Sequence, residues 1–228
     1  MPDRRLLAVD VAIKVATVLL LAWAVLSPDL PQFSGKAFTG RAVAYPIALV
    51  ALPVGWWVLG RPRGFAFPVA ADILLGVPFL IDVAGNALDL YDAVEWWDDA
   101  NHLVNWGLHT AAIGLLLRAG DWGQWTRATL AFGWAASTAV LWELAEYVAF
   151  VPDSPEAATA YADTLGDLAL GLIGGAIAAV AVSRLPSANR RSTGTPDRAA
   201  RAPRPIPVGR EQATSEADPG DGLPWGES

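Results

Sequence analysis

LLAVDVAIKVATVLLLAWAVL, residues 6–26, decides the fold class, because its length and apolar character match a membrane-spanning helix. Similar stretches follow at residues 41–59, 65–90, 100–117, 127–150 and 161–182. Each is near the ~20 residues that cross a bilayer core. None alternates strictly between apolar and polar residues, as a barrel strand does. The sequence therefore predicts an all-α protein, a polytopic transmembrane bundle of six helices.

The composition agrees with a membrane protein whose main partner is the lipid bilayer. Hydrophobic residues make up 54% of the 228 residues and charged residues only 17%. No Walker loop or dinucleotide fingerprint is present, and we expect no nucleic-acid partner. The absence of cysteine excludes disulfides and thiolate metal ligands.

The distribution of charge predicts the orientation in the membrane. One side of the six predicted spans carries most of the arginines: Arg4, Arg5, Arg61, Arg63, Arg118, Arg127, Arg184, Arg190 and Arg191. The other side carries only Lys36 and Arg41 as basic residues, and its loops are acidic. Because basic loops stay in the cytoplasm, both termini are predicted to be cytoplasmic, in a bacterial cytoplasmic membrane that the chain crosses several times.

Two domains follow from the change of composition near residue 186. Residues 1–185 form the predicted transmembrane domain, and residues 186–228, rich in Ser, Pro, Arg and Gly, form a predicted disordered cytoplasmic tail. The first span is expected to be a retained anchor rather than a cleaved signal peptide. Its Asp10 and Lys14 lie four residues apart and can neutralise each other on one helix face.

Polar side chains follow one face of the third and fourth predicted spans. The third carries Asp82, Asn86 and Asp89 at spacings of four and three residues, which stacks them on an α-helix. The fourth continues this pattern with spacings of four, three and four residues, in Asp98, His102, Asn105 and His109. Both groups lie at the predicted outer end of their helices.

The fifth and sixth spans bring further acidic residues to the same predicted end. The fifth ends with Glu143, Glu146 and Tyr147, and the sixth begins with Tyr161, Asp163 and Asp167. An ionisable group within a membrane costs several kcal/mol unless it is paired, hydrated or bound to a metal. Their convergence on four helices therefore predicts an outward-facing functional site.

Several segments together resemble the YjdF-like family of bacterial integral membrane proteins. They are Asp82 to Asn86, Asp89 to Asp92, Trp96 to His102, Trp142 to Tyr147 and Tyr161 to Asp167. The resemblance covers about residues 65–182 and implies a membrane protein without an established biochemical function. The order of an Asp before a His, a Glu-rich helix end and a last Asp is also similar, more distantly, to VanZ-like proteins. Those are associated with tolerance of glycopeptide antibiotics. Here Tyr147 replaces a frequent Gln, and the loop before Asp163 is acidic and without arginine, where those proteins have a basic residue.

One interpretation of the site is a divalent-metal centre. Carboxylates and imidazole suit magnesium, manganese or zinc, and a bound metal ion could activate water against an envelope lipid or a lipid-linked substrate. The predicted metal ligands are Asp99, His102, Asp163 and Asp167. The predicted catalytic residues are Asp98, Glu143 and Glu146. The predicted substrate-binding residues are Asp82, Asn86, Asp89, Asn105, His109, Tyr147 and Tyr161.

Two alternatives stay open on the sequence alone. Acids and histidines inside a bundle also mark ion or solute pathways in transporters, although the polar stripe ends near His109 and Thr110. A buried network of carboxyls, amides and tyrosines can instead serve only to fix how the helices pack. The sequence leaves the substrate, the metal and the oligomeric state undetermined.

Overall fold

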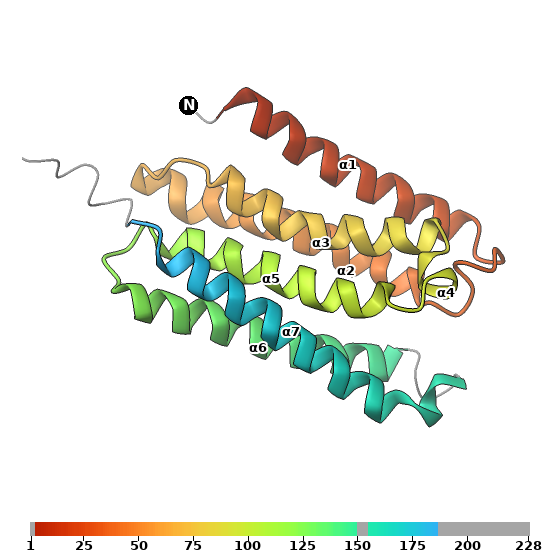
Figure 1. Cartoon of the computed structure of the whole chain (residues 1–228). Helices are drawn as coiled ribbons and strands as arrows, with labels where there is room; N and C mark the ends of the chain where they lie inside the picture. The colour runs from red at the N-terminus through yellow and green to blue at the C-terminus, as the bar shows by residue number, and fades with distance from the viewer. Residues whose placement is uncertain (1–2, 150–154, 187–228) are drawn as a thin grey trace, which may run out of the picture. The chain divides into compact units, whose positions relative to one another are not determined.

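A computed structural model describes residues 3–149 and 155–186, and every regular element within them is helical (Figure 1). The longer helices are α1 (Arg4–Leu26), α2 (Phe38–Gly55), α3 (Val69–Ala87), α5 (Trp97–Leu117), α6 (Gln124–Ala149) and α7 (Ala160–Ser183). The shorter ones are η1 (Trp56–Gly60), η2 (Arg61–Arg63), α4 (Leu90–Ala93) and η4 (Pro155–Ala158). They belong to one compact unit, Met1–Ser192. The predicted tail, residues 186–228, lies outside the described residues apart from Pro186.

Four of the described helical segments are long and apolar enough to cross a membrane. They are Arg4–Leu26, Phe38–Arg63, Val69–Ala87 and Ala160–Ser183. Large apolar side chains on them are exposed, as for Leu19 at 64% and Ile47 at 63%, which suits contact with lipid rather than water. α5 and α6 have 21 and 26 residues, enough to span, but their polar side chains lower their hydropathy. The count of six spans therefore stays a prediction.

The predicted third span, residues 65–90, is too long at both ends. α3 begins after Pro68, which has no N–H to donate, and ends at Ala87. Asp89 then adopts a left-handed backbone conformation with φ of 60° and starts the short helix α4, which the sequence did not predict. Asp89 therefore does not continue the face of Asp82 and Asn86, contrary to the predicted stripe.

The second and fourth predicted spans are instead shorter than the helices that form them. Helical structure of the second span runs from Phe38 through a π-helical turn and a 3-10 turn to Arg63, rather than from 41 to 59. α5 begins three residues earlier than predicted, at Trp97, which places Asp98 inside its first turn.

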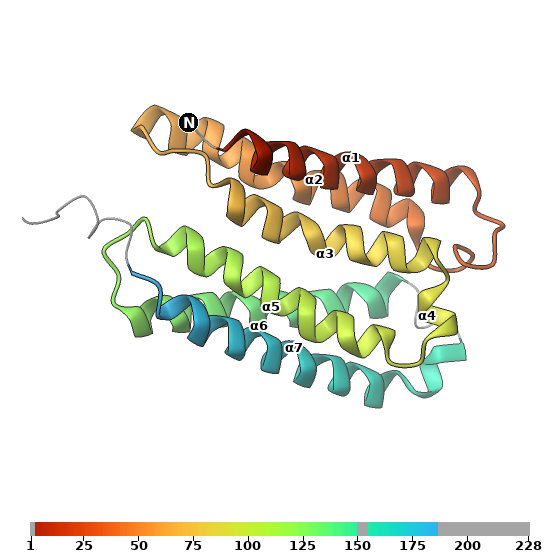
Figure 2. The same cartoon turned by 45° about the horizontal axis from the view of Figure 1, so that its top comes forward.

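Two sets of helices face each other across the bundle. α1 and α2 pack on α3, and α6 and α7 pack on α5, while contacts between α3 and α5 join the two sets (Figure 2). A hydrophobic core fills the α1–α3 side near the end that carries Asp82. It consists of Leu21, Ala24, Phe33, Phe38, Tyr45 and Val83.

Glycines set the close approach of α5 and α7, the most extensive helix pair in the protein. A side chain at Gly174 would collide with the backbone carbonyl of Leu103, and one at Gly114 with Val182. Gly171 packs in the same way against the ring of Trp106. Small residues on α7 therefore let the two helix backbones approach closely.

Candidate functional site

Four acidic side chains from three helices surround His102. Asp98 and His102 come from the start of α5, Glu143 and Glu146 from the end of α6, and Asp167 from the second turn of α7. We call these five residues the acidic cluster. They meet because α6 ends at the level where α5 and α7 begin, so residues distant in sequence reach one level of the bundle.

The imidazole of His102 faces carboxylates on both sides. Its Nε2 lies 3.7 Å from Asp98 Oδ1 and 3.8 Å from Asp167 Oδ1. Its Nδ1 lies 3.6 Å from Glu143 Oε1, and the side chains of His102 and Glu143 are each only 8% exposed. Neither Nδ1 nor that Oε1 has a hydrogen-bond partner among the residues that the structure describes. Two buried polar atoms thus face each other without a bond, which is costly unless a ligand satisfies them.

The donor atoms are spaced as metal ligands require. Asp98, His102 and Asp167 form one group, and His102, Glu143 and Glu146 form another, with the donor atoms of each group within 4.8 Å of one another. Two tetrahedral ligand atoms each ~2.1 Å from a metal ion lie about 3.4 Å apart. The unpaired atoms favour the second group, with Nδ1 as the ligand atom, while Nε2 faces Asp98 and Asp167.

Two of the predicted metal ligands lie at the edge of this arrangement. Asp99 and Asp163 are exposed and belong to neither donor group among the described residues. Asp98 has an intermediate position, with its side chain 46% exposed.

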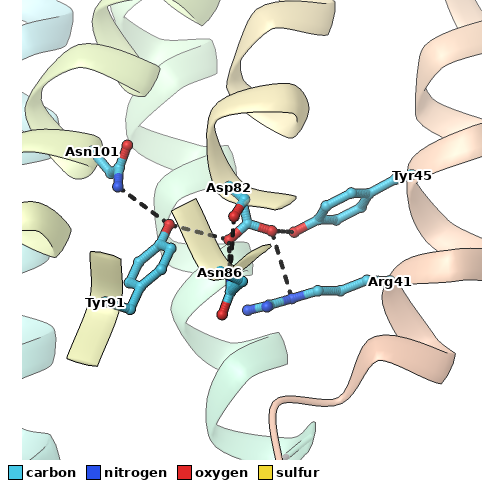
Figure 3. Close-up of polar contacts among 6 residues, drawn as sticks. All are labelled: Arg41, Tyr45, Asp82, Asn86, Tyr91 and Asn101. Atoms are coloured by element: carbon cyan, nitrogen blue, oxygen red, sulfur yellow. Dashed lines mark hydrogen bonds and ion pairs between the residues drawn. The ribbon is translucent and has the colours of Figure 1, made fainter. Parts of the chain in front are cut away.

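A second polar assembly surrounds Asp82 (Figure 3). Its members are Arg41, Tyr45, Asp82, Asn86, Tyr91 and Asn101, which we call the Asp82 network. The Tyr45 hydroxyl donates to Asp82 Oδ2 at 2.6 Å, and the Tyr91 hydroxyl donates to Oδ1 at 3.1 Å. Asn86 Nδ2 also donates to Oδ1, at 3.3 Å, and Arg41 Nε lies 3.6 Å from Oδ2. Both oxygens of Asp82 are thus satisfied within the protein.

The short helix α4 supplies the link between this network and α5. Asn101 Nδ2 donates to the Tyr91 hydroxyl at 3.2 Å. Burial and the nearby charge of Asp82 raise the pKa of Tyr91, so its phenol stays protonated as a donor. The predicted participant Asp89 is exposed instead, because its left-handed backbone turns it out of the helix face.

A cavity of about 410 Å³ lies between the acidic cluster and the Asp82 network. Its lining includes Asp98, His102 and Glu146 of the acidic cluster and Arg41 and Asp82 of the Asp82 network. Further along, its lining includes the predicted residues Asn105 and His109 together with the rings of Phe79, Trp106 and Trp142. The cavity therefore combines a charged end with an aromatic end.

The two predicted tyrosines lie elsewhere. Tyr147 and Tyr161 are 56% and 81% exposed. Both line a separate hollow of about 390 Å³ between α6 and α7, which Glu143 of the acidic cluster also lines. The structure therefore separates them from the residues that border the main cavity.

Buried charges also occur far from the acidic cluster. Lys14 Nζ lies 2.7 Å from Asp10 Oδ2 and 2.5 Å from Asp72 Oδ2, which joins α1 to α3. The sequence predicted the pair of Asp10 and Lys14, and the structure confirms it. The sequence did not predict that Asp72 also pairs with the Lys14 ammonium group.

Sequence analysis missed four members of the Asp82 network: Arg41, Tyr45, Tyr91 and Asn101. Arg41 and Tyr45 lie four residues apart, which places them on one face of α2, and this spacing was a usable signal. Asn101 directly precedes His102. No local pattern indicated Tyr91, because its position depends on the turn at Asp89.

Long helices with exposed apolar faces and a buried polar interior define the protein as a helical membrane protein. A family model described as a predicted membrane protein (DUF2238) matches residues 9–188, and the chain belongs to this family. The match confirms the resemblance to the YjdF-like membrane proteins and gives no support to the VanZ-like one. No curated protein and no solved structure matches the chain.

Proposed function

We propose that the acidic cluster binds a divalent metal ion and that the protein is a membrane enzyme acting on an envelope lipid or lipid-linked substrate. The observation that carries this proposal is the facing pair of His102 Nδ1 and Glu143 Oε1, both buried and without hydrogen bonds. A metal ion between them satisfies both atoms and offsets the repulsion among the carboxylates.

In this proposal, His102, Glu143 and Glu146 hold the metal ion, and Asp98 and Asp167 orient the imidazole from its Nε2 side. Magnesium, manganese and zinc suit these nitrogen and oxygen donors. When bound, such an ion polarises a phosphoryl or carbonyl oxygen and acidifies water. The half-exposed Asp98 carboxylate is placed to accept a proton at its Oδ atoms, as a general base.

The proposal includes the orientation predicted from the arginines. Six spans within residues 1–185 cross the bacterial cytoplasmic membrane with both termini in the cytoplasm, and the acidic cluster faces outward. The arginine-poor loops at that end support this orientation. An outward site has access to lipid headgroups of the outer leaflet and to lipid-linked envelope precursors.

Elemental analysis of the detergent-purified protein tests the metal centre. We expect about one divalent ion per chain in the wild type and none in a His102→Ala, Glu143→Ala double variant. The matched control is Asp99→Ala with Asp163→Ala, which removes two exposed acids beside the cluster and should retain the ion. Lack of metal in the wild type after divalent ions are added back would overturn the proposal and favour a transport or packing role.

A further inference from the structure

The main cavity opens through the side of the helix bundle. Ala44 of α2 and Leu141 and Ala145 of α6 line the cavity and are also exposed, Leu141 at 63%. These rim residues come from α2 and α6, and their exposure marks the side of the bundle on which the cavity is open. In a membrane this side faces hydrocarbon, and the apolar rim forms an entrance for the chain of a lipid.

The charged end of the cavity contains a single strong cation. Among the described residues that line it, Arg41 alone is an arginine or lysine. Its Nε faces Asp82, whereas its Nη1 is buried and has no hydrogen-bond partner within residues 3–149 and 155–186. A guanidinium group with free terminal donors binds phosphate oxygens in a geometry that an ammonium group does not offer.

The remaining charges decide what sort of anion this end accepts. The Asp82 carboxylate offsets the charge of Arg41, and Asp98 and Glu146 border the same cavity. A phosphate is attracted here only when a metal ion offsets the carboxylates of the acidic cluster, as in the proposed function on which this step rests. Arg41 and a metal ion held by the acidic cluster would then both be available to bind one phosphate, since the residues of both line the same cavity.

We propose that the cavity binds a membrane lipid that carries a phosphate group. The phosphate lies between Arg41 and the acidic cluster, and the lipid chain passes the rings of Phe79 and Trp142 and leaves between α2 and α6. Arg41 is the recognition residue for the phosphate, and the gap beside Ala145 is the entrance for the chain. This assigns the substrate class of the site as a lipid phosphate.

Native mass spectrometry of the full-length, metal-loaded protein with dioleoyl phosphatidate tests the inference. We expect one bound phosphatidate per chain, at least tenfold weaker binding of dioleoylglycerol, and no competition by inorganic phosphate. Equal binding of dioleoylglycerol would overturn the role of the phosphate. Equally strong competition by inorganic phosphate would overturn the assignment to a lipid.

Two substitutions test the two halves of the site separately. Arg41→Lys, which keeps the charge but loses the guanidinium fork, is expected to weaken phosphatidate binding about tenfold. Ala145→Trp, which fills the entrance, is expected to do the same, whereas Ala176→Trp at an exposed alanine of α7 should leave binding unchanged. Retained binding in both Arg41→Lys and Ala145→Trp, with thermal unfolding like the wild type, would overturn the inference.

Metal analysis of the same samples separates this inference from the proposed function. Both substitutions should leave the metal content unchanged, because neither residue belongs to a donor group. A metal-loaded protein that does not distinguish phosphatidate from dioleoylglycerol retains the metal centre and overturns the lipid site. A metal-free protein that binds phosphatidate through Arg41 overturns the metal centre and the part assigned to a metal ion in attracting the phosphate, and leaves Arg41 as the recognition residue.

Discussion

His102 Nδ1 and Glu143 Oε1 lie 3.6 Å apart, and both atoms are buried without a hydrogen-bond partner. Within a folded protein, unpaired buried polar atoms are uncommon because each costs about 1–3 kcal/mol. This contact joins α5 to α6 and lies within the acidic cluster. It makes this pair the most direct place to test whether the cluster serves binding or packing.

Glu143→Gln should separate these two roles. If the carboxylate is a ligand, its amide replacement should abolish metal binding while stabilising the metal-free protein by about 1–3 kcal/mol, because a buried charge is removed. Elemental analysis and thermal unfolding of the metal-free protein measure the two effects. A packing role would be indicated if the wild type binds no metal and Glu143→Gln is less stable than the wild type.

Loss of one hydroxyl from the Asp82 network should lower stability without affecting metal content. Tyr45→Phe leaves Asp82 Oδ2 without its 2.6 Å hydrogen bond, and we expect a destabilisation of about 1–3 kcal/mol. Tyr161→Phe is the control, because that side chain is 81% exposed and should tolerate the change. Loss of metal in Tyr45→Phe would show that the two assemblies act as one.

A side chain at Gly174 should separate α5 from α7. Gly174→Ala places a methyl group against the carbonyl of Leu103, and overpacking of this kind costs about 1–3 kcal/mol. Movement of α7 also takes Asp167 away from His102, so weaker metal binding should accompany the loss of stability. Gly166→Ala, on the same helix but with open space around it, should show neither effect in thermal unfolding and elemental analysis.

Removal of the Lys14 ammonium should strongly destabilise the protein. Lys14→Met leaves the carboxylates of Asp10 and Asp72 buried together, and breaking a buried ion pair on one side costs about 3–5 kcal/mol. Adding Asp72→Asn should restore part of this stability, because one of the two carboxylates is then neutral. Equal stabilities of the single and double variants in thermal unfolding would contradict this explanation.

The matched control for Lys14 is the lysine of an exposed ion pair. Lys36 Nζ lies 2.5 Å from Asp92 Oδ2, whose side chain is 56% exposed. Surface pairs of this kind contribute about 0–1 kcal/mol, so Lys36→Met should have little effect on unfolding.

Helical periodicity predicted much of the candidate site because most of its residues lie on regular helices. Asp98 and His102 share a face of α5 as their spacing predicted, and Glu143 and Asp167 lie at the predicted level on their helices. Asp89 is the exception. A periodicity argument assumes an unbroken helix, and α3 ends two residues earlier.

The division of the polar residues into two assemblies was not predictable from spacing. Asp82 was expected beside the other acids as a substrate-binding residue, but Tyr45 and Tyr91 occupy its oxygens. Which side chains satisfy a carboxylate depends on how α2, α3 and α4 pack, and these contacts join residues far apart in the chain. The predicted roles of the individual residues stay predictions.

By itself, the sequence determined that the protein is helical and belongs in a membrane, because long apolar segments have few other stable states. It also determined at which end of the bundle the acids gather, since that follows from the order and direction of the helices. Only the tertiary structure decided that His102 faces Glu143 and that Arg41 pairs with Asp82. The physical reason is that helix rotation and helix separation depend on side-chain packing, as at Gly174 and Leu103, and not on the pattern within any one helix.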